Sequence, residues 1–207
     1  MIALAARGIR KSFGRHRVLT GLDIEVVAGE LVAVVGENGS GKTTLLRILA
    51  GDLRADAGSV ASSGRPGYCP QRVVLDDALT VDQHVRYFQA AYGIGTPGRA
   101  DELIERLGYT TYRGQRVGIL SGGTRQKLSL TLALMHDPSV LLLDEPYQGF
   151  DWQTYLAFWE LTDELRARGT STVVISHMVF EQDRFDRVCH LKDSRIDEEA
   201  SRHAPAA

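Results

Sequence analysis

The chain has 207 residues, of which 43% are hydrophobic and 24% are charged, and its formal net charge is −2. These values are typical of a soluble globular domain and give no general electrostatic attraction for nucleic acid or anionic lipid. No apolar stretch approaches the roughly 18 residues of a membrane span, and no export signal is visible at the N-terminus. Cys69 and Cys189 lack the spacing of a metal site, so we expect buried thiols rather than a disulfide.

The first third of the chain predicts strands around a glycine-rich loop. Residues 2–9 and 22–26 alternate between apolar and polar side chains, as half-buried strands do, and a polar turn at residues 11–16 separates them. The apolar run at residues 31–35 predicts a buried strand, and residues 44–50 have a helical pattern. An antiparallel β part is therefore expected near the N-terminus.

The rest of the chain predicts short strands at residues 54–70, then a helical insertion and an alternation of helices with strands. From about residue 80 to residue 120, apolar residues recur at a spacing of three to four. Helices and buried strands then alternate at residues 121–135, 140–143, 152–168 and 172–175. Such alternation predicts a parallel sheet with ligands at its carboxyl edge. The polar segment 193–207 is expected to fray.

Residues 36–43 predict a phosphate-binding loop, because they fit G-x-x-x-x-G-K-[ST] between a strand and a helix. Backbone N–H groups of such a loop and the positive end of the helix bind phosphate oxygens. Lys42 would reach the β- and γ-phosphates, and the Thr43 hydroxyl would bind Mg²⁺. The residues predicted to hold a nucleoside triphosphate are Gly36, Glu37, Asn38, Gly39, Ser40, Gly41, Lys42, Thr43 and Thr44.

Two adjacent carboxylates, Asp144 and Glu145, follow the buried strand at residues 140–143. Neighbouring side chains of a strand point in different directions, so the two can have different roles. Asp144 suits the Mg²⁺ shell, and Glu145 suits a general base that polarises the water attacking the γ-phosphate. An Asp-Glu pair alone would indicate a solvated turn, but the phosphate loop upstream favours the catalytic interpretation.

Leu120 to Gln126 read Leu-Ser-Gly-Gly-Thr-Arg-Gln and open a predicted helix. They resemble the LSGGQ-type signature of the ATP-binding-cassette (ABC) ATPases. Ser121, Gly122 and Gly123 at a helix N-terminus form a second anion-binding surface, which one triphosphate does not easily need from the same subunit. A head-to-tail dimer is therefore expected, in which Ser121 of one copy faces the γ-phosphate held by the other. A plain helix cap is the alternative for Ser121.

The resemblance covers residues from about 4 to 191 and implies further site residues. Gln71 is similar to the glutamine of the family's Q-loop, which contacts Mg²⁺ and the water, and His177 is similar to the switch histidine, which contacts the γ-phosphate. Asp151 resembles the D-loop aspartate at the dimer interface. Phe13 stands where the family has an aromatic residue that stacks on adenine, with a core Phe as the alternative.

Three positions depart from the family pattern. Tyr147 replaces a common Thr, Thr124 stands in the place usually given to Gln or Met, and Lys127 replaces a common Arg. None of these changes removes a catalytic group, so we expect an active ATPase.

The sequence therefore predicts an α/β fold. We expect a P-loop NTPase core with a mainly parallel sheet, an N-terminal antiparallel β part and an inserted helical subdomain. Residues 1–207 would form one ABC ATPase domain. Its RecA-like core would span about 1–72 and 121–192, its helical subdomain about 73–120, and its polar tail 193–207.

The resemblance implies the ATP-hydrolysing subunit of an ABC transporter, peripheral on the inner face of the membrane through a separate transmembrane permease. The implied catalytic residues are Glu145, His177, Gln71 and Lys42, and the implied Mg²⁺ ligands are Thr43, Gln71 and Asp144. The permease would dock beside Gln71, in a groove that includes Val73, Val74, Leu75, Leu79 and Tyr87.

Export of a drug, antibiotic, lipid, polysaccharide or haem is favoured by the resemblance of a compact cassette to exporter-type subunits, and import is not excluded. A soluble ABC ATPase, such as an iron–sulfur assembly ATPase, is the alternative. A small-molecule kinase built on the same loop would have no use for Ser121 across a dimer.

Overall fold

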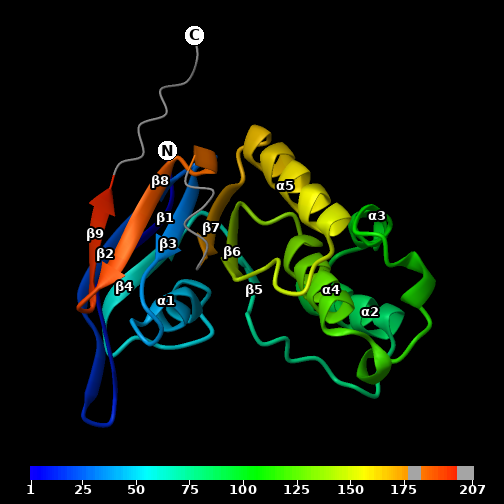
Figure 1. Cartoon of the computed structure of the whole chain (residues 1–207), viewed down its shortest axis with the longest axis horizontal. Helices are drawn as coiled ribbons and strands as arrows, with labels where there is room; N and C mark the ends of the chain where they lie inside the picture. The colour runs from blue at the N-terminus through cyan, green and yellow to red at the C-terminus, as the bar shows by residue number, and fades with distance from the viewer. Residues whose placement is uncertain (177–182, 200–207) are drawn as a thin grey trace.

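Two β-sheets and a group of helices make up the molecule in Figure 1. The structure is a computed structural model that describes residues 1–176 and 183–199. Its strands are β1 (Ile2–Phe13), β2 (His16–Val27), β3 (Leu31–Val35), β4 (Ala57–Ser62), β5 (Gly67–Cys69), β6 (Val140–Asp144), β7 (Ser171–Ile175), β8 (Arg187–Lys192) and β9 (Arg195–Glu199). Its α-helices are α1 (Lys42–Leu49), α2 (Val81–Tyr92), α3 (Gly98–Arg106), α4 (Gly122–Leu134) and α5 (Trp152–Ala167).

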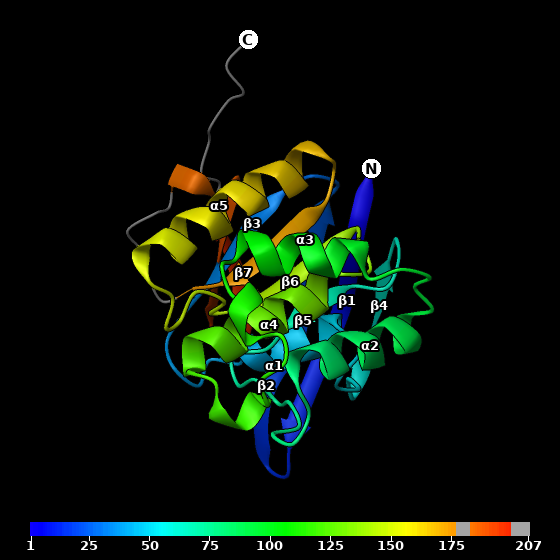
Figure 2. The ribbon, with the colours of Figure 1, turned by 90° about the vertical axis from the view of Figure 1, so that its right-hand side faces the viewer.

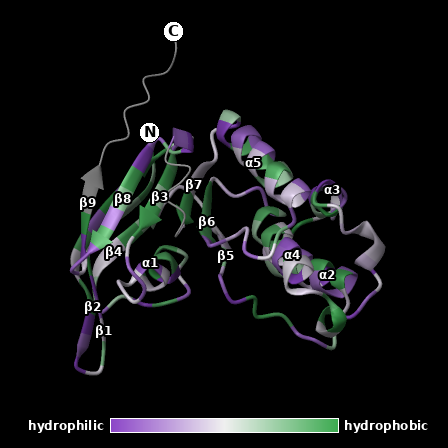
Figure 3. Ribbon diagram, viewed as in Figure 1, coloured by the Kyte–Doolittle hydropathy of each residue, from purple (hydrophilic) through white to green (hydrophobic). Residues whose placement is uncertain are grey.

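The larger sheet has the strand order β5-β6-β7-β3-β8-β9, and only β9 runs antiparallel to its neighbour. Every residue of β3, β6 and β7 is buried, and Figure 3 shows β3 and β6 as largely hydrophobic. Strands covered on both faces need apolar side chains in both directions, which explains the continuous apolar runs. Because these three strands are parallel, the segments that follow them meet at one edge of the sheet.

The smaller sheet is antiparallel, with the order β2-β1-β4, and faces the larger sheet across α1 (Figure 1). Apolar side chains of β1, β2 and α1 form one hydrophobic core with one face of β3, β6 and β7. The predicted antiparallel part is therefore confirmed, although its hairpin is longer than expected. Phe13 pairs with His16, so the turn is only two residues long, and residues 11–13 belong to β1. The polar side chains of Lys11 and Ser12 hid the strand pattern.

Helices α4 and α5 pack against the other face of the larger sheet, and α2 and α3 pack against α4 (Figures 1 and 2). They form a second hydrophobic core with that face. A capping box fixes the start of α2, since Thr80 accepts a hydrogen bond from Gln83 N and the Gln83 side chain accepts one from Thr80 N. Tyr109 links the helical insertion to α4, because its hydroxyl donates a hydrogen bond of 2.6 Å to the Thr131 hydroxyl. This arrangement confirms the predicted helical part.

The segment after β8 differs from the expectation of a frayed tail. After a turn at Asp193 and Ser194, residues 195–199 form β9 and pair with β8. The strand is polar and lies at the edge of the sheet, where charged side chains are common, so its sequence resembles that of a tail. Both cysteines are buried and free, as expected. None of the helices in residues 1–176 and 183–199 has the length and apolar character needed to cross a bilayer.

Candidate nucleotide site

A cavity of about 700 Å³ lies at the carboxyl edge of the larger sheet. Its volume falls within the range of small-molecule sites. The structure brings predicted residues from four separate segments into it. The lining residues are Phe13, Val18, Asn38, Gly39, Gly41, Lys42, Thr43, Thr44, Gln71, Asp144, Glu145, Gln148 and Ile175.

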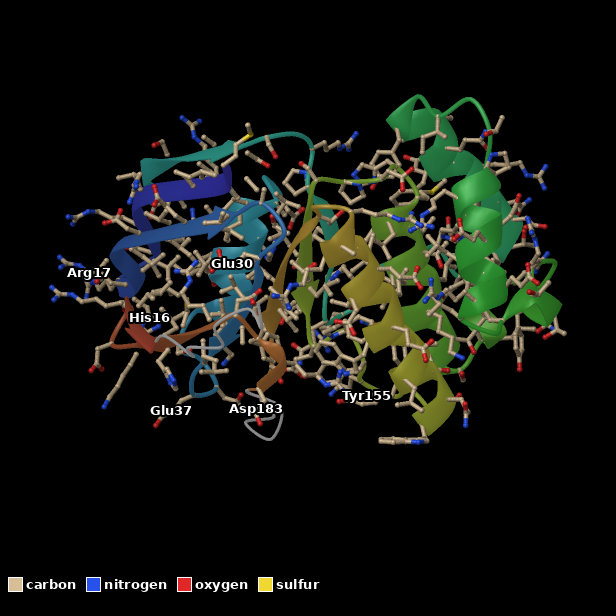
Figure 4. All side chains as sticks on the ribbon, turned by 90° about the horizontal axis from the view of Figure 1, so that it is seen from above. His16, Arg17, Glu30, Glu37, Tyr155 and Asp183 are labelled. Atoms are coloured by element: carbon tan, nitrogen blue, oxygen red, sulfur yellow. The ribbon has the colours of Figure 1, made fainter. Side chains whose placement is uncertain are left out.

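The glycine-rich loop between β3 and α1 requires glycine at Gly41, which has a φ of 106° and immediately precedes α1. A Cβ atom here would lie 2.9 Å from Val18 Cγ1, closer than packed atoms allow. The helix therefore begins with its backbone N–H groups turned toward the loop, which is the arrangement that binds phosphate. Gly36, Glu37 and Ser40 line a neighbouring hollow of about 490 Å³ instead of the main cavity. In Figure 4 Glu37 lies on the same side of the molecule as His16, which lines that hollow.

Lys42 is 6% exposed, and its Nζ donates hydrogen bonds to the carbonyl oxygens of Gly36 at 2.7 Å and Glu37 at 2.9 Å. Burial lowers its pKa, while the carboxylates of Glu145 and Asp144 act in the opposite direction. The lysine is thus held by loop carbonyls inside the cavity, next to both acidic side chains. A bound phosphate would offer it stronger, charge-assisted partners than these neutral oxygens.

Thr43 and Asp144 both line the main cavity, and their side-chain oxygen atoms suit a Mg²⁺ ion. Asp144, at the end of β6, is only 1% exposed. In triphosphate sites Mg²⁺ is usually bound by one or two carboxylates together with phosphate oxygens and water. A hydroxyl and a buried carboxylate therefore fit the ion.

Glu145 has an unusual backbone conformation, with a φ of 50°. Its backbone N–H donates to the Ile175 carbonyl at 3.1 Å, across the ends of the adjacent strands β6 and β7. Its side chain accepts a hydrogen bond of 2.9 Å from Gln71 Nε2. The two residues are 74 positions apart in sequence, so the fold alone brings them together.

Ser121 caps α4: its Oγ accepts a hydrogen bond from Thr124 N at 3.2 Å and lies 2.9 Å from the Thr124 hydroxyl. Gly122 and Gly123 line a separate hollow of about 350 Å³ that also includes Gln71. None of these three residues is among the described residues that line the main cavity. In one copy of the chain the two predicted anion-binding surfaces therefore line different hollows, which share Gln71 and Gln148.

Phe13 is 52% exposed at the edge of the main cavity, so the alternative of a core Phe is wrong. The Lys11 ammonium lies 5.6 Å from the centre of its ring. Asp151 caps α5, because its Oδ1 accepts from Thr154 N at 2.8 Å, and that N–H lowers its pKa. His177 lies outside the described residues.

Three lining residues were not predicted from the sequence, and one of them, Ile175, is the last residue of β7. Val18 reaches the cavity because β2 pairs with β1 beside Phe13. Gln148 reaches it from the loop after β6, three residues beyond Glu145. The sequence signal that could have indicated Gln148 is its position in a glycine-containing loop just after Asp144 and Glu145.

A wide groove of about 820 Å³ lies between the end of α1, the segment after β5, and α2. Of the residues predicted for permease docking, Val74 lines this groove and is 89% exposed. Leu75 is partly buried and packs against the core of the helical side, and Val73 lines the hollow near Gly122. Gln71 borders the groove as well as the main cavity.

Comparisons with known proteins agree on one family. Residues 19–148 match the family described as ABC transporter. The chain is 36% identical to a Nod factor export ATP-binding protein I of Burkholderia lata, over 96% of this chain and 70% of that protein. It is also 36% identical to an aliphatic sulfonates import ATP-binding protein of Xanthomonas axonopodis pv. citri, over 94% of this chain and 69% of that protein.

The fold is also that of solved cassettes. A dimeric bacterial ABC transporter cassette superposes with a TM-score of 0.88 at 22% identity, over 97% of this chain and 100% of that one. A phosphate-binding loop that leads into a helix, next to a strand that ends in a buried Asp, defines the class of P-loop NTPases. Within that class the chain belongs to the ABC transporter family and is an ATPase subunit of that family.

Proposed function

We propose that two copies of this chain bind two Mg²⁺·ATP between them, hydrolyse them, and drive a separate transmembrane permease. One observation carries the dimer: the phosphate loop, Asp144 and Glu145 share a cavity, whereas Gly122 and Gly123 open on a different hollow. A second copy, turned head to tail, would place its Ser121 helix opposite the γ-phosphate. The helix N-terminus would then act on the phosphate charge of the neighbouring copy.

In this proposal the loop lysine, the hydroxyl, the amide and the two carboxylates of the cavity have separate parts in hydrolysis. Lys42 and the N–H groups of the loop hold the β- and γ-phosphates, and Thr43, Asp144 and Gln71 would hold Mg²⁺, which neutralises phosphate charge when bound. Glu145 takes a proton from the attacking water. The water oxygen forms a bond to the γ-phosphorus, and the bond from that phosphorus to the bridging oxygen breaks. ADP and phosphate result.

Glu145→Gln tests the catalytic assignment, because the amide keeps the size of the side chain but accepts no proton. We expect ATP affinity within about twofold of wild type and a turnover at least about a hundredfold lower. Size-exclusion chromatography with light scattering should show a dimer in ATP. A variant that hydrolyses ATP at the wild-type rate would remove Glu145 from the role of base.

Ser121→Arg tests the dimer, because a long cation would block the surface that faces the other copy. Hydrolysis should fall by at least about tenfold, while the nucleotide affinity of the isolated chain stays unchanged, since Ser121 does not line that chain's own cavity. A loss of affinity in the isolated chain would contradict the assignment of Ser121 to the opposite copy.

The groove that contains Val74 is the proposed docking site of the permease, which would hold the chain at the inner face of the membrane. Arg65 and Arg72 border it together with the apolar side chains of Val74 and Phe88. This combination suits a short segment with apolar residues and a carboxylate. Co-purification with a polytopic membrane protein should be lost in Val74→Asp and kept in Val60→Asp, an equally polar change on β4. A chain that acts without any membrane partner would instead favour the soluble ABC ATPase.

Export is the proposed direction, on the basis of the resemblance to exporter-type subunits and to the Nod factor export protein. The sulfonate importer has the same identity to this chain, so import is the outcome that the assay must exclude. In membrane vesicles that expose the ATPase on the outside, added ATP should drive cargo inward. ATP-driven release from such vesicles would show import.

A further inference from the structure

Tyr147 makes a contact that a smaller residue at its position could not make. Its ring packs edge-to-face against Tyr155 and Phe158 of α5, at centroid distances of 5.7 and 5.9 Å. Its hydroxyl is hydrogen-bonded to the hydroxyl of Ser176. Tyr155 is labelled beside α5 in Figure 4 and marks the aromatic side of this contact. The ring spans the distance between the helix and the end of β7.

Ser176 directly follows β7 and is 2% exposed. The residue before it, Ile175, accepts the hydrogen bond from the backbone N–H of Glu145. Two consecutive residues at the end of β7 therefore hold the loop after β6, one through the backbone of Glu145 and the other through the side chain of Tyr147.

The backbone of Glu145 needs such support. With a φ of 50°, Glu145 is in the left-handed region, which is unfavourable for a side chain with a Cβ atom. Conformations of this kind persist only where surrounding contacts fix them, and they are concentrated at functional sites. The turn itself adds a hydrogen bond from Phe150 N to Tyr147 O at 3.1 Å, so the residue whose ring packs on α5 also accepts a backbone bond within the loop.

We propose that Tyr147 is a positioning residue, whose bond to Ser176 holds the Glu145 carboxylate in place beside Gln71. The proposal rests on the proposed function, in which Glu145 is the general base. A ring without the hydroxyl would fill the aromatic cluster equally well, so the hydroxyl has a separate role. That role is to join the loop carrying the base to the end of β7.

Tyr147→Phe, Ser176→Ala and the double variant test this bond. Because small displacements of a catalytic group have large effects on rate, we expect each single variant to lower kcat about tenfold, with the KM for MgATP within about twofold. The double variant should be no slower than the slower single variant, since both changes break the same bond. Should Tyr147→Phe fail to fold, Ser176→Ala carries the same prediction with the ring in place.

Tyr109→Phe is the matched control, because it removes another tyrosine hydroxyl bond, that to Thr131, from the helical side. Tyr109→Phe should lower the melting temperature about as much as Tyr147→Phe does, and it should leave kcat unchanged. An unchanged kcat in Tyr147→Phe, a rise in KM alone, or multiplicative losses in the double variant would each overturn the proposal. If Glu145→Gln is inactive in the same assay, such a result refutes the positioning role alone; if Glu145→Gln is fully active, the proposed function fails.

Discussion

Gly122 and Gly123 are adjacent in α4, yet the structure predicts opposite effects for alanine at the two positions. A Cβ atom on Gly122 would meet nothing within 4 Å. A Cβ atom on Gly123 would collide with the carbonyl oxygen of Gly149 and lie 3.3 Å from its carbonyl carbon. Both obstacles are backbone atoms, so no side chain can rotate away. Either the start of α4 or the loop at Gly149 must move.

The free energies follow from this difference. Overpacking costs about 1–3 kcal/mol, and replacing Gly by Ala inside a helix returns up to about 1 kcal/mol. Gly123→Ala should therefore be less stable than Gly122→Ala by about 2 kcal/mol, near the middle of the overpacking range. With an m value of roughly 2.5 kcal/mol/M, the urea midpoints should differ by about 0.8 M.

Urea unfolding followed by circular dichroism measures this difference, and the ATPase rate of the folded variant measures its effect on function. The start of α4 and the loop at Gly149 border one hollow, so Gly123→Ala should also slow hydrolysis without changing the nucleotide affinity of the isolated chain. Equal midpoints for the two variants would refute the close backbone contact between Gly123 and Gly149.

Two further predictions concern the base of the nucleotide and the contact between α3 and α5. Phe13→Ala should weaken ATP binding about fivefold, because it removes a stacking energy of about 1 kcal/mol. Phe13→Trp should retain the affinity, and calorimetric titration measures both variants. An unchanged Kd in Phe13→Ala would place adenine elsewhere. Arg106 donates two hydrogen bonds of 2.6 Å to Glu164 and lowers its pKa from the ordinary value of 4.5. That pair stabilises the fold above the unfolded-state pKa and ceases to do so as pH falls through the lower folded-state pKa. Glu164→Gln should thus melt below wild type at pH 7, with the gap narrowing below pH 4.5 in scanning calorimetry; a gap independent of pH would contradict this.

Prediction from the sequence was most accurate where the residues of a single segment show a hydrophobic pattern or a motif of their own. The run at residues 31–35 coincides with β3, and the glycine loop follows it as expected, because a buried central strand must be apolar on both faces. The full length of the hairpin at Phe13 and the strand β9 were not predicted from the sequence. β9 consists mostly of polar residues, Phe13 adjoins a polar turn, and pairing with a neighbouring strand holds both segments, a contact that no local pattern records.

Contacts between distant segments could not be predicted in detail. The motifs indicated that Gln71 and Glu145 belong to one site, but their hydrogen bond depends on the pairing of β5 with β6. In the same way, Tyr147 was visible only as a departure from a family pattern. Its partner Ser176 is 29 positions away and is brought near because β6 and β7 are neighbours.

Gln71 borders the main cavity, the hollow beside Gly123 and the groove beside Val74. A ligand that contacts Gln71 in one of these spaces would contact a side chain whose amide also donates a hydrogen bond to Glu145. Binding at any of the three surfaces would in this way act on the same side chain. Coupling of these surfaces to the proposed base would then need no longer path than the one hydrogen bond between Gln71 and Glu145.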